Sequence, residues 1–292
     1  MLISVIISTY NRPDALNAVL RGMLRQTDRD FEVLVADDGS DEITGDAIHA
    51  FIGQLPVKIQ RVWQPDRGFR LAAMRNRAIA KASGNYFIFL DGDCVPRADF
   101  VARHRALSEP GHYVFGQRIL LSKSYSERIL NDNIDISGLS FPQLAFARMR
   151  GHVNRALPAL PLPLGSLRKA HPRDWRRLRG CNFAAWREDV MRVDGFDGSY
   201  VGWGLEDSDF AVRLCNAGVR AKDGRFATAV LHLWHPMGDR EMLAESLRHF
   251  EHAKATGAVK AQKGLSSLTI HPATRPGTDP GIQTDEPATS DE

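Results

Sequence analysis

The sequence predicts an α/β fold with a mostly parallel central sheet flanked by helices, and three observations support this prediction. Between residues 2 and 90, apolar runs rich in β-branched side chains alternate with segments of helical periodicity. Most of these runs end in a cluster of polar residues. The chain of 292 residues, 43% of them hydrophobic, can bury a sizeable core. Strands that alternate with helices are typical of a parallel sheet with right-handed crossovers.

The predicted elements of the first half follow one another as strand, loop and helix. We expect strands at 2–9, 31–35, 57–62 and 85–90. We expect helices at 14–24, 43–51 and 71–82, the first of them capped by Asp14.

Polar residues gather where three of the predicted strands end. They lie at 9–12, 37–40 and 91–93. In open parallel sheets, ligands bind outside the carboxyl ends of the strands, and these ends share one edge of the sheet. The three clusters are therefore expected to converge on one site.

The cluster Asp91-Gly92-Asp93 carries the most chemical information. In an extended chain Asp91 and Asp93 point the same way, and Gly92 lets the backbone approach a ligand closely. Two such carboxylates can hold a hard divalent cation, Mn²⁺ or Mg²⁺, and through it a nucleotide diphosphate. A lone Asp-x-Asp is also good turn chemistry, so this spacing alone leaves both interpretations open.

The second half of the chain is less regular. The alternation fades after residue 115, and a Pro- and Leu-rich piece at 157–164 is interpreted as a loop or flap. A hydrophobic patch in contact with lipid is the alternative for that piece. Compact motifs return at 180–218, and a helix is expected at 240–256. Residues 263–292 have little apolar content and are predicted to be disordered.

The net charge of +3 is unevenly distributed along the chain. Residues 148–179 contain nine Arg or Lys and one acid, Asp174. We interpret this basic segment as a surface apposed to anionic lipid or to an anionic, lipid-linked acceptor. Binding to nucleic acid is disfavoured, because the segment lacks regularly interleaved aromatic residues.

The cysteines and the N-terminus bear on the cellular compartment. Cys94, Cys181 and Cys215 are far apart, which favours neither a disulfide framework nor a zinc cluster, so a reducing compartment, the cytoplasm, is expected. Residues 2–7 are too short for a signal sequence, and no run reaches the roughly 18 apolar residues of a membrane span. Any membrane contact is therefore expected to be peripheral, at the inner face of the plasma membrane.

Four motifs in the first half resemble those of glycosyltransferase family 2, whose nucleotide-sugar domain has the GT-A fold. They are Ser8-Thr9-Tyr10-Asn11, Asp37-Asp38-Gly39-Ser40, Arg75-Asn76 and Asp91-Gly92-Asp93. The resemblance covers roughly the first hundred residues and depends on the order of several motifs. It implies a Rossmann-like GT-A domain and a UDP-sugar donor.

The same resemblance implies roles for individual residues. Asp38 would accept hydrogen bonds from uracil, Arg70 would lie near the diphosphate, Asp93 would be the direct metal ligand, and Asp91 would lie nearer the ribose. The whole set expected to bind the nucleotide is Ser8, Thr9, Tyr10, Asn11, Arg12, Asp38, Gly68, Arg70, Arg75, Asn76, Asp91 and Gly92.

The second half carries a separate signature that ends in Gly202-Trp203-Gly204-Leu205-Glu206-Asp207-Ser208-Asp209. With Gly180-Cys181-Asn182 and Gly195-Phe196-Asp197 before it, this block resembles the carboxy-terminal segment of β-1,4-galactosyltransferases and bacterial chondroitin polymerases. By this resemblance the catalytic residues are Asp207, as general base, and Glu206. Acceptor contacts would come from Trp203, Gly204 and Glu206. Leu205 replaces a glycine of the galactosyltransferases, so their substrate preference does not transfer.

The acidic run has a structural interpretation as well. Negative charge is favourable at a helix N-terminus, and the pattern continues helically after Phe210. Asp209 could therefore cap a helix while Asp207 faces the site.

Two histidines follow a predicted strand at 227–231. His232 and His235 resemble the family position at which a late residue, often His, completes the metal shell. Both can bind one cation only if the chain turns at Trp234, because residues three apart on a strand point to opposite faces.

Together these features predict an inverting, metal-dependent transferase that moves a hexose or N-acetylhexosamine from a UDP-sugar to a hydroxyl of a glycan acceptor. Residues 1–115 would form the nucleotide-sugar half and 116–262 the acceptor half. A bacterial lipopolysaccharide, capsule or other surface polysaccharide is the expected product. The alternatives are a sugar nucleotidyltransferase and a non-catalytic binding protein; a dehydrogenase is disfavoured because Gly-x-Gly-x-x-Gly is missing from the first turn.

Overall fold

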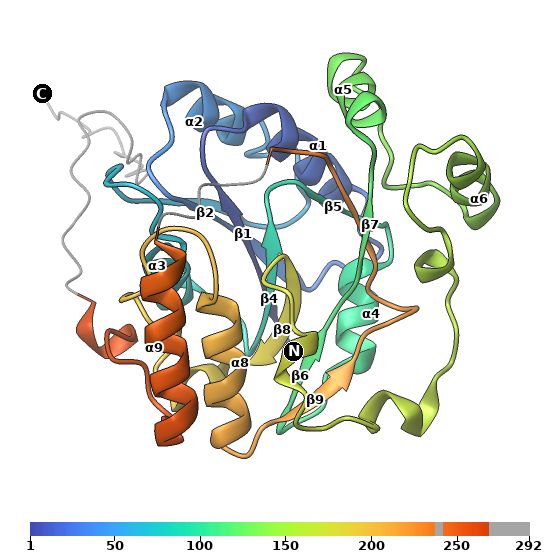
Figure 1. Ribbon diagram of the computed structural model, residues 1–292. Helices are drawn as coiled ribbons and strands as arrows, with labels where there is room; N and C mark the ends of the chain where they lie inside the picture. The colour runs from blue at the N-terminus through green and yellow to red at the C-terminus, as the bar shows by residue number, and fades with distance from the viewer. Residues whose placement is uncertain (237–241, 269–292) are drawn as a thin grey trace, which may run out of the picture.

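The computed structural model describes residues 1–236 and 242–268, and the described chain is built around two β-sheets. The large sheet has seven strands in the order β3-β2-β1-β4-β8-β6-β9, and the small sheet has the order β5-β10-β7. Figure 1 shows the large sheet running through the middle of the molecule, with helices on both sides.

The strands of the two sheets have the following bounds. They are β1 (Ile3–Thr9), β2 (Phe31–Asp37), β3 (Ile59–Trp63), β4 (Tyr86–Asp91), β5 (Cys94–Pro96), β6 (His112–Phe115), β7 (Arg118–Leu120), β8 (Asn182–Trp186), β9 (Arg220–Asp223) and β10 (Val230–His232).

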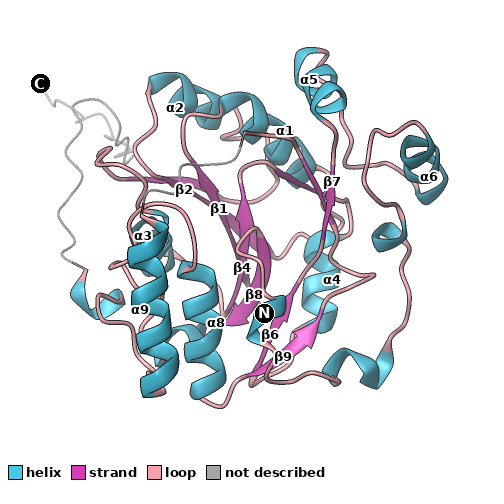
Figure 2. Ribbon diagram, viewed as in Figure 1, coloured by secondary structure: helices cyan, strands magenta, loops and turns pink. Residues whose placement is uncertain are grey.

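Figure 2 shows the helices in cyan and the strands in magenta. The α-helices are α1 (Pro13–Leu24), α2 (Glu42–His49), α3 (Leu71–Lys81), α4 (Phe100–Leu107), α5 (Lys123–Asn131), α6 (Phe141–Met149), α7 (Arg187–Arg192), α8 (Glu206–Asn216) and α9 (Leu243–Thr256). Single 3₁₀ turns are η1 (Leu157–Ala159), η2 (Gly165–Lys169), η3 (Trp175–Arg177) and η4 (Leu265–Ser267).

The predicted α/β fold with a mostly parallel sheet is confirmed. Strands β3, β2, β1 and β4 pair in parallel, and the register sets Thr9 opposite Asp37 and Ser8 opposite Asp91. The polar ends of these strands therefore share one edge, as the sequence predicts. β8 joins antiparallel to β4, so residues of the second half extend the same sheet.

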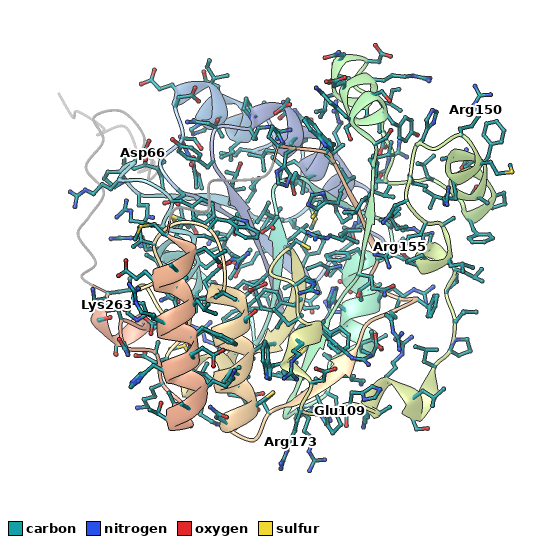
Figure 3. All side chains as sticks on the ribbon, viewed as in Figure 1. Asp66, Glu109, Arg150, Arg155, Arg173 and Lys263 are labelled. Atoms are coloured by element: carbon teal, nitrogen blue, oxygen red, sulfur yellow. The ribbon has the colours of Figure 1, made fainter. Side chains whose placement is uncertain are left out.

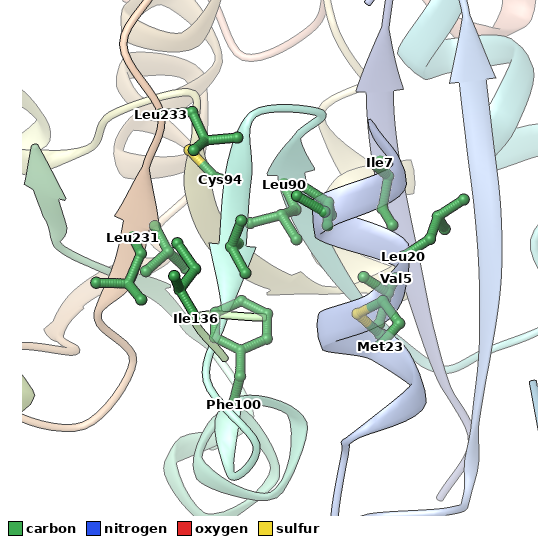
Figure 4. Close-up of a cluster of buried hydrophobic side chains, with 14 of the residues drawn as sticks. Val5, Ile7, Leu20, Met23, Leu90, Cys94, Phe100, Ile136, Leu231 and Leu233 are labelled. Atoms are coloured by element: carbon green, nitrogen blue, oxygen red, sulfur yellow. The ribbon is translucent and has the colours of Figure 1, made fainter. Parts of the chain in front are cut away.

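Side chains that alternate between the two faces of the large sheet form two hydrophobic cores, one on each face. Val5 and Ile7 of β1 pack under α1, whose Leu20 and Met23 meet them in Figure 4. Ile6 points the other way, into the core under α3 and α8. Successive side chains of a strand face opposite sides of the sheet, so one buried strand supplies both layers.

Two helix starts differ from the prediction. Arg12, not Asp14, is the N-cap of α1, because Pro13 occupies the first helical position with its fixed φ angle and Asp14 falls in the first turn. α8 follows Leu205, a residue with a left-handed φ of 72°, and it has no side-chain cap. Asp209 is therefore not the cap; it pairs with Arg213 one turn further on, at 2.7 Å.

The C-terminal expectation needs a correction at 263–268. Leu265 packs against the core under α3, and Ser266 donates hydrogen bonds from its backbone and side chain to Asp194. The backbone amide of Lys263 bonds Asp197 at 3.2 Å. These residues are ordered because the preceding turn supplies carboxylate acceptors for their amides. Residues 269–292 of the predicted disordered tail lie outside the described chain.

Part of the basic segment is structural. Arg168 is buried and donates to the carbonyl oxygens of Asp223 and Arg225 at 2.7 and 2.8 Å. The Pro-rich piece contributes Pro158 and Ala159 to the interior. No helix of the described chain is both long and apolar enough to cross a membrane.

Candidate active site

Arg75 lies at the centre of the polar edge and joins the two halves of the chain. It is fully buried on α3, which the sequence predicts. Its Nη2 donates to Asp91 Oδ1 at 3.0 Å and to the carbonyl of Gly180 at 2.8 Å, and its Nε donates to Ser8 Oγ at 3.3 Å. Its Nη1 lies 3.6 Å from Glu206 Oε1. One cation thus holds Asp91 of the first half beside Glu206 of the second.

Several carboxylates surround the single guanidinium of Arg75, and the pKa values of two of them, Asp91 and Glu206, are raised. Burial raises the pKa of Asp91 to about 6; Arg75 opposes this, and Asp93 and Asp207 add to it. Burial raises the pKa of Glu206 to about 7, Asp207 adds to the shift, and Arg75 again opposes it. This excess of negative charge favours the binding of a cation at the site.

Asp93 lies between the two predicted histidines. His232 Nε2 lies 3.7 Å from one carboxylate oxygen of Asp93, and His235 Nε2 lies 3.4 Å from the other. Strand β10 ends at His232, and the backbone amide of Trp234 bonds Ser126, so the chain leaves the strand where the sequence requires a turn. Both imidazoles therefore reach the same carboxylate.

These side chains suit a divalent cation. A carboxylate with imidazoles is a donor set for Mn²⁺, whereas Mg²⁺ prefers oxygen ligands alone. Burial lowers the pKa of His232, although Asp93 opposes the shift, and a neutral imidazole is the form that binds metal.

The sequence-based set omitted Cys94. Its Sγ, a carboxylate oxygen of Asp93 and a nitrogen of His232 all lie within 4.8 Å of one another. Burial raises the pKa of the Cys94 thiol, and the side chain also packs beside Leu233 in the hydrophobic cluster of Figure 4. The sequence could have indicated Cys94 as a candidate metal ligand, because it directly follows Asp93.

Asp38 directly follows β2 and is buried. It is 5% exposed and accepts hydrogen bonds from Gln64 Nε2 at 2.5 Å and from the backbone amide of Arg70 at 2.6 Å. Burial raises the pKa of Asp38, and these two donors oppose the shift. The Arg70 guanidinium reaches the carbonyl of Pro65. Gln64, which the sequence did not single out, is the side chain that orients this carboxylate.

The loop after β1 is fixed by hydrogen bonds to its neighbours. Asn11 has a left-handed φ of 46°; its amide donates to Ser40 Oγ and its side chain accepts from the amide of Asp41, both at 2.9 Å. Tyr10 is exposed and its hydroxyl donates to Asp66 at 2.9 Å. This bonding holds the two strand-end loops beside each other.

Thr9, Gly92 and Arg12 complete this loop region. The Thr9 hydroxyl is buried and has no hydrogen-bond partner within the described chain. The amide of Gly92 donates to the carbonyl of Ser8 at 2.7 Å, and a Cβ there would lie 2.8 Å from that oxygen, so the position favours glycine. Arg12 pairs with Asp14 at 3.1 Å.

Two residues of the expected nucleotide set serve the scaffold. Asn76 is 1% exposed, and its amide group bonds both the N–H and the carbonyl of Phe196, at 2.8 and 2.7 Å. Its polar atoms are therefore turned to the scaffold, away from the strand ends. Gly68 has a φ of 80° and donates to Asp66, which is a turn function.

The acidic pair at the start of α8 faces the same edge. Asp207 Oδ2 accepts from the amide of Gly180, and its Oδ1 accepts from the amide of Ser208, both at 2.7 Å. Glu206 is 8% exposed. These bonds fix the Asp207 carboxylate in one orientation beside the Arg75 cluster.

The loop before α8 carries Trp203 and Gly204 and contacts the donor side. Trp203 is 43% exposed, and Gly202 and Gly204 have φ angles of 82° and 111°. The amide of Gly202 donates to the carbonyl of Phe69 at 2.9 Å, which joins this loop to the segment before α3. Part of the Trp203 side chain is therefore exposed to solvent beside the start of α8.

Two protein-family models match the chain. The model described as glycosyl transferase family 2 matches residues 4–157, and the one described as the N-terminal domain of galactosyltransferase matches residues 166–236. The two matches cover the two sets of motifs separately, and together they include Asp38, Asp93, Asp207 and both histidines.

Two similar curated proteins come from bacteria. A validoxylamine A glucosyltransferase of Streptomyces hygroscopicus subsp. jinggangensis is 30% identical over 230 residues, which cover 75% of this chain and 52% of that protein. A chondroitin synthase of Escherichia coli is 29% identical over 249 residues, covering 77% of this chain and 34% of that protein. The chain thus spans about half or less of the length of these relatives.

Solved structures share the fold at low identity. The mannosyltransferase PcManGT of Pyrobaculum calidifontis, in complex with GDP-Man and Mn²⁺, superposes with a TM-score of 0.55 at 19% identity, covering 88% of this chain and 68% of that one. GalNAc-T7 with UDP, GalNAc and Mn²⁺ gives a TM-score of 0.54 at 15% identity, covering 80% and 44%. The fold is therefore GT-A.

These findings decide among the classes considered from the sequence. A glycosyltransferase is supported, and the nucleotidyltransferase and the non-catalytic binding protein are not. The family 2 model matches more than half of the residues. The chain belongs to glycosyl transferase family 2.

Proposed function

We propose that this protein is an inverting, metal-dependent glycosyltransferase that moves a hexose or N-acetylhexosamine from a UDP-sugar to a hydroxyl of a glycan acceptor. One observation carries the proposal. Asp91, which accepts a hydrogen bond from Arg75, is close enough to both Asp93 and Asp207 for each carboxylate to raise its pKa, and Asp93 has two imidazoles beside it. A donor diphosphate and an acceptor hydroxyl can therefore meet there.

The donor nucleotide would lie along the ends of β1 and β2. Asp38 is held by two hydrogen bonds and keeps further lone pairs with which to accept the imide N–H of uracil. The loop of Tyr10 and Asn11 would line the base and ribose. That GalNAc-T7 was solved with UDP supports this choice, although PcManGT was solved with GDP-Man.

Asp93, His232 and His235 would hold Mn²⁺ or Mg²⁺, with Mn²⁺ favoured by the imidazoles. When bound, the cation supplies positive charge against the leaving diphosphate. Arg75 adds a fixed positive charge next to Asp91 and needs no reorganisation, because it is fully buried and already bonded.

The acceptor would approach between Trp203 and the start of α8. Asp207 would take the proton from the attacking hydroxyl, since its carboxylate is oriented by the amides of Gly180 and Ser208. Glu206 would hydrogen-bond the acceptor, and a pyranose ring would stack on Trp203. One base and one displacement invert the anomeric configuration without a covalent intermediate.

The biological setting we propose is synthesis of a bacterial surface polysaccharide, such as lipopolysaccharide or capsule, in the cytoplasm. The likeness to a chondroitin synthase, a protein named for making a polysaccharide, supports that setting. The likeness to a glucosyltransferase supports a hexose donor.

The test is release of UDP from a panel of UDP-sugars, with Mn²⁺ or with EDTA. We expect one donor to be turned over only with metal. Asp93→Ala should lose the metal dependence together with turnover, and Asp207→Asn should bind UDP yet release none from that donor. Asp132→Asn, at a solvent-exposed carboxylate at the C-terminal end of α5, is the matched control and should behave as wild type. Turnover that is equal in EDTA would contradict the proposal.

A further inference from the structure

A surface without acidic residues surrounds α6. We propose that this surface docks the protein on an anionic lipid bilayer. Residues 136–173 contain no Asp or Glu. α6 stands at the edge of the molecule, apart from the seven-stranded sheet (Figure 1). The proposal deepens the proposed function, because a lipid-linked acceptor would be met at such a membrane.

α6 has one face buried and the opposite face apolar but exposed. Leu144 and Ala147 pack into the core, as the inner face of a surface helix does. Phe146 and Met149, three residues apart on the outer face, are 57% and 76% exposed. Leu157, in the turn that follows, is 62% exposed. Large apolar side chains grouped in this way mark a contact surface.

Two arginines accompany these apolar side chains. Arg148 and Arg150, at the end of α6, are exposed, and within the described chain neither lies within ion-pair distance of a carboxylate; Arg155 is exposed too but lies nearer the middle of the molecule than Arg150 (Figure 3). Arg150 stacks over the ring of Phe146, with its guanidinium carbon 5.6 Å from the ring centre. An apolar patch with unpaired arginines at its rim matches the chemistry of an anionic headgroup layer: side chains insert between headgroups and the arginines meet phosphates.

This docking surface is narrower than the basic segment at 148–179. Arg168 is buried, and Lys169 pairs with Glu109 at 2.5 Å, so neither is available to lipid. Arg173 is exposed but lies at the opposite end of the molecule from Arg150 (Figure 3). The docking surface therefore comprises the exposed face of α6 with Arg148 and Arg150, and Leu157 of the adjoining turn η1.

The chain after α6 brings this surface to the metal side of the active site. The amide of Ser122 bonds the carbonyl of His152 at 2.8 Å, and Val153 forms a β-bridge with Leu121. The amide of Leu121 in turn bonds the carbonyl of His232 at 2.9 Å. The docking surface and the predicted metal ligand are thus joined through consecutive backbone hydrogen bonds. A membrane at α6 would present lipid-linked substrate on this side.

The test is sedimentation of the full chain with vesicles. Wild type should bind mixed phosphatidylcholine–phosphatidylglycerol vesicles at about 0.1 M salt and not vesicles of phosphatidylcholine alone. Phe146→Ser with Met149→Ser should weaken binding at least about tenfold, and Arg148→Gln and Arg150→Gln should each weaken it about fivefold. Should the serine pair fail to fold by circular dichroism, the arginine variants alone decide, since these side chains make no ion pair within the described chain.

Matched controls separate this surface from general stickiness. Ile43→Ser removes an equally exposed apolar side chain on α2, and Arg173→Gln with Arg176→Gln removes two exposed charges of the basic segment. Both should bind as wild type.

Three results would overturn the proposal: no binding of wild type to anionic vesicles, equal loss in the controls, or a wild-type dimer that the serine pair makes monomeric without vesicle binding. Binding needs no donor sugar, so its failure leaves the proposed transfer reaction standing, and failure of UDP release leaves the docking surface standing.

Discussion

Replacing Arg75 with Met tests whether one buried guanidinium holds the active site together. Methionine fills a similar volume but removes the charge, the three hydrogen bonds to Asp91, Gly180 and Ser8, and the 3.6 Å ion pair with Glu206. Removing one partner of a buried ion pair costs about 3–5 kcal/mol, because the remaining charge is left uncompensated. Total stabilities are about 5–15 kcal/mol, so the loss is a large fraction of the whole.

The loss of stability in Arg75→Met should depend on pH, and the pKa of Glu206 determines whether the loss is larger at high or at low pH. Its pKa in the folded protein is raised from 4.5 to about 7, so folding favours the protonated carboxyl and this group loses stability as pH rises through about 7. Arg75 lowers that pKa, and its removal moves the pKa higher still. Arg75→Met should therefore be more destabilising at pH 8 than at pH 5, where Glu206 can bind a proton.

Urea unfolding at pH 5 and pH 8, in EDTA, measures this directly. Arg103→Met is the matched control: Arg103 pairs with Asp99 at 2.9 Å, but both side chains are about 40% exposed, and such pairs contribute about 0–1 kcal/mol. A loss below about 1 kcal/mol for Arg75→Met at pH 8, or a loss that is the same at both pH values, would refute the reasoning.

Three further predictions concern single contacts. His232→Gln and His235→Gln should each raise the Mn²⁺ concentration for half-maximal turnover by about 10- to 100-fold, whereas the control His49→Gln should not. If the Mn²⁺ titrations of the two variants match that of wild type, the imidazoles are not metal ligands. Asn76→Ala should lower the free energy of unfolding in urea by about 1–3 kcal/mol, because the backbone N–H and carbonyl of Phe196 lose their partner. The Kd for UDP should not change; a higher Kd would show that Asn76 does contribute to nucleotide binding. Gly92→Ala should lower the Tm, because its Cβ would lie 2.8 Å from a carbonyl oxygen of β1; an unaltered Tm would show that β1 can move.

The parts of the fold that local pattern determines were predictable from the sequence. β1, β2 and β4 are buried on both faces and therefore appear in the sequence as nearly continuous apolar runs, and the helices between the strands follow the 3.6-residue period. The shared polar edge follows from parallel pairing alone. The two imidazoles were expected to reach one site only if the chain left its strand course near Trp234; β10 ends at His232, and both imidazoles lie within 3.7 Å of Asp93.

The parts that depend on distant partners could not be predicted in this way. Asn76 belongs to a motif of the nucleotide half, but its partner is the backbone of Phe196, 120 residues away. Gln64 stands at the end of β3 and reaches Asp38 only because β2 and β3 pair in register. Residues 263–268 lack the apolar content of a core segment, and it is the carboxylates of Asp194 and Asp197 that order them.

Arg75 shows why both halves are needed for one site. In the first half alone, the guanidinium of Arg75 would still have Asp91 and Ser8 as partners. Glu206 of the second half has its ion-pair partner in the first half, because Arg75 Nη1 lies 3.6 Å from its carboxylate. The second half therefore buries a carboxylate whose charge a guanidinium of the first half compensates. Burial also raises the pKa of Glu206. Packing of the second half against the first is therefore linked to protonation of the Glu206 carboxyl. A substitution that loosens the contact between the halves should thus change the pH dependence of turnover even when it touches neither substrate.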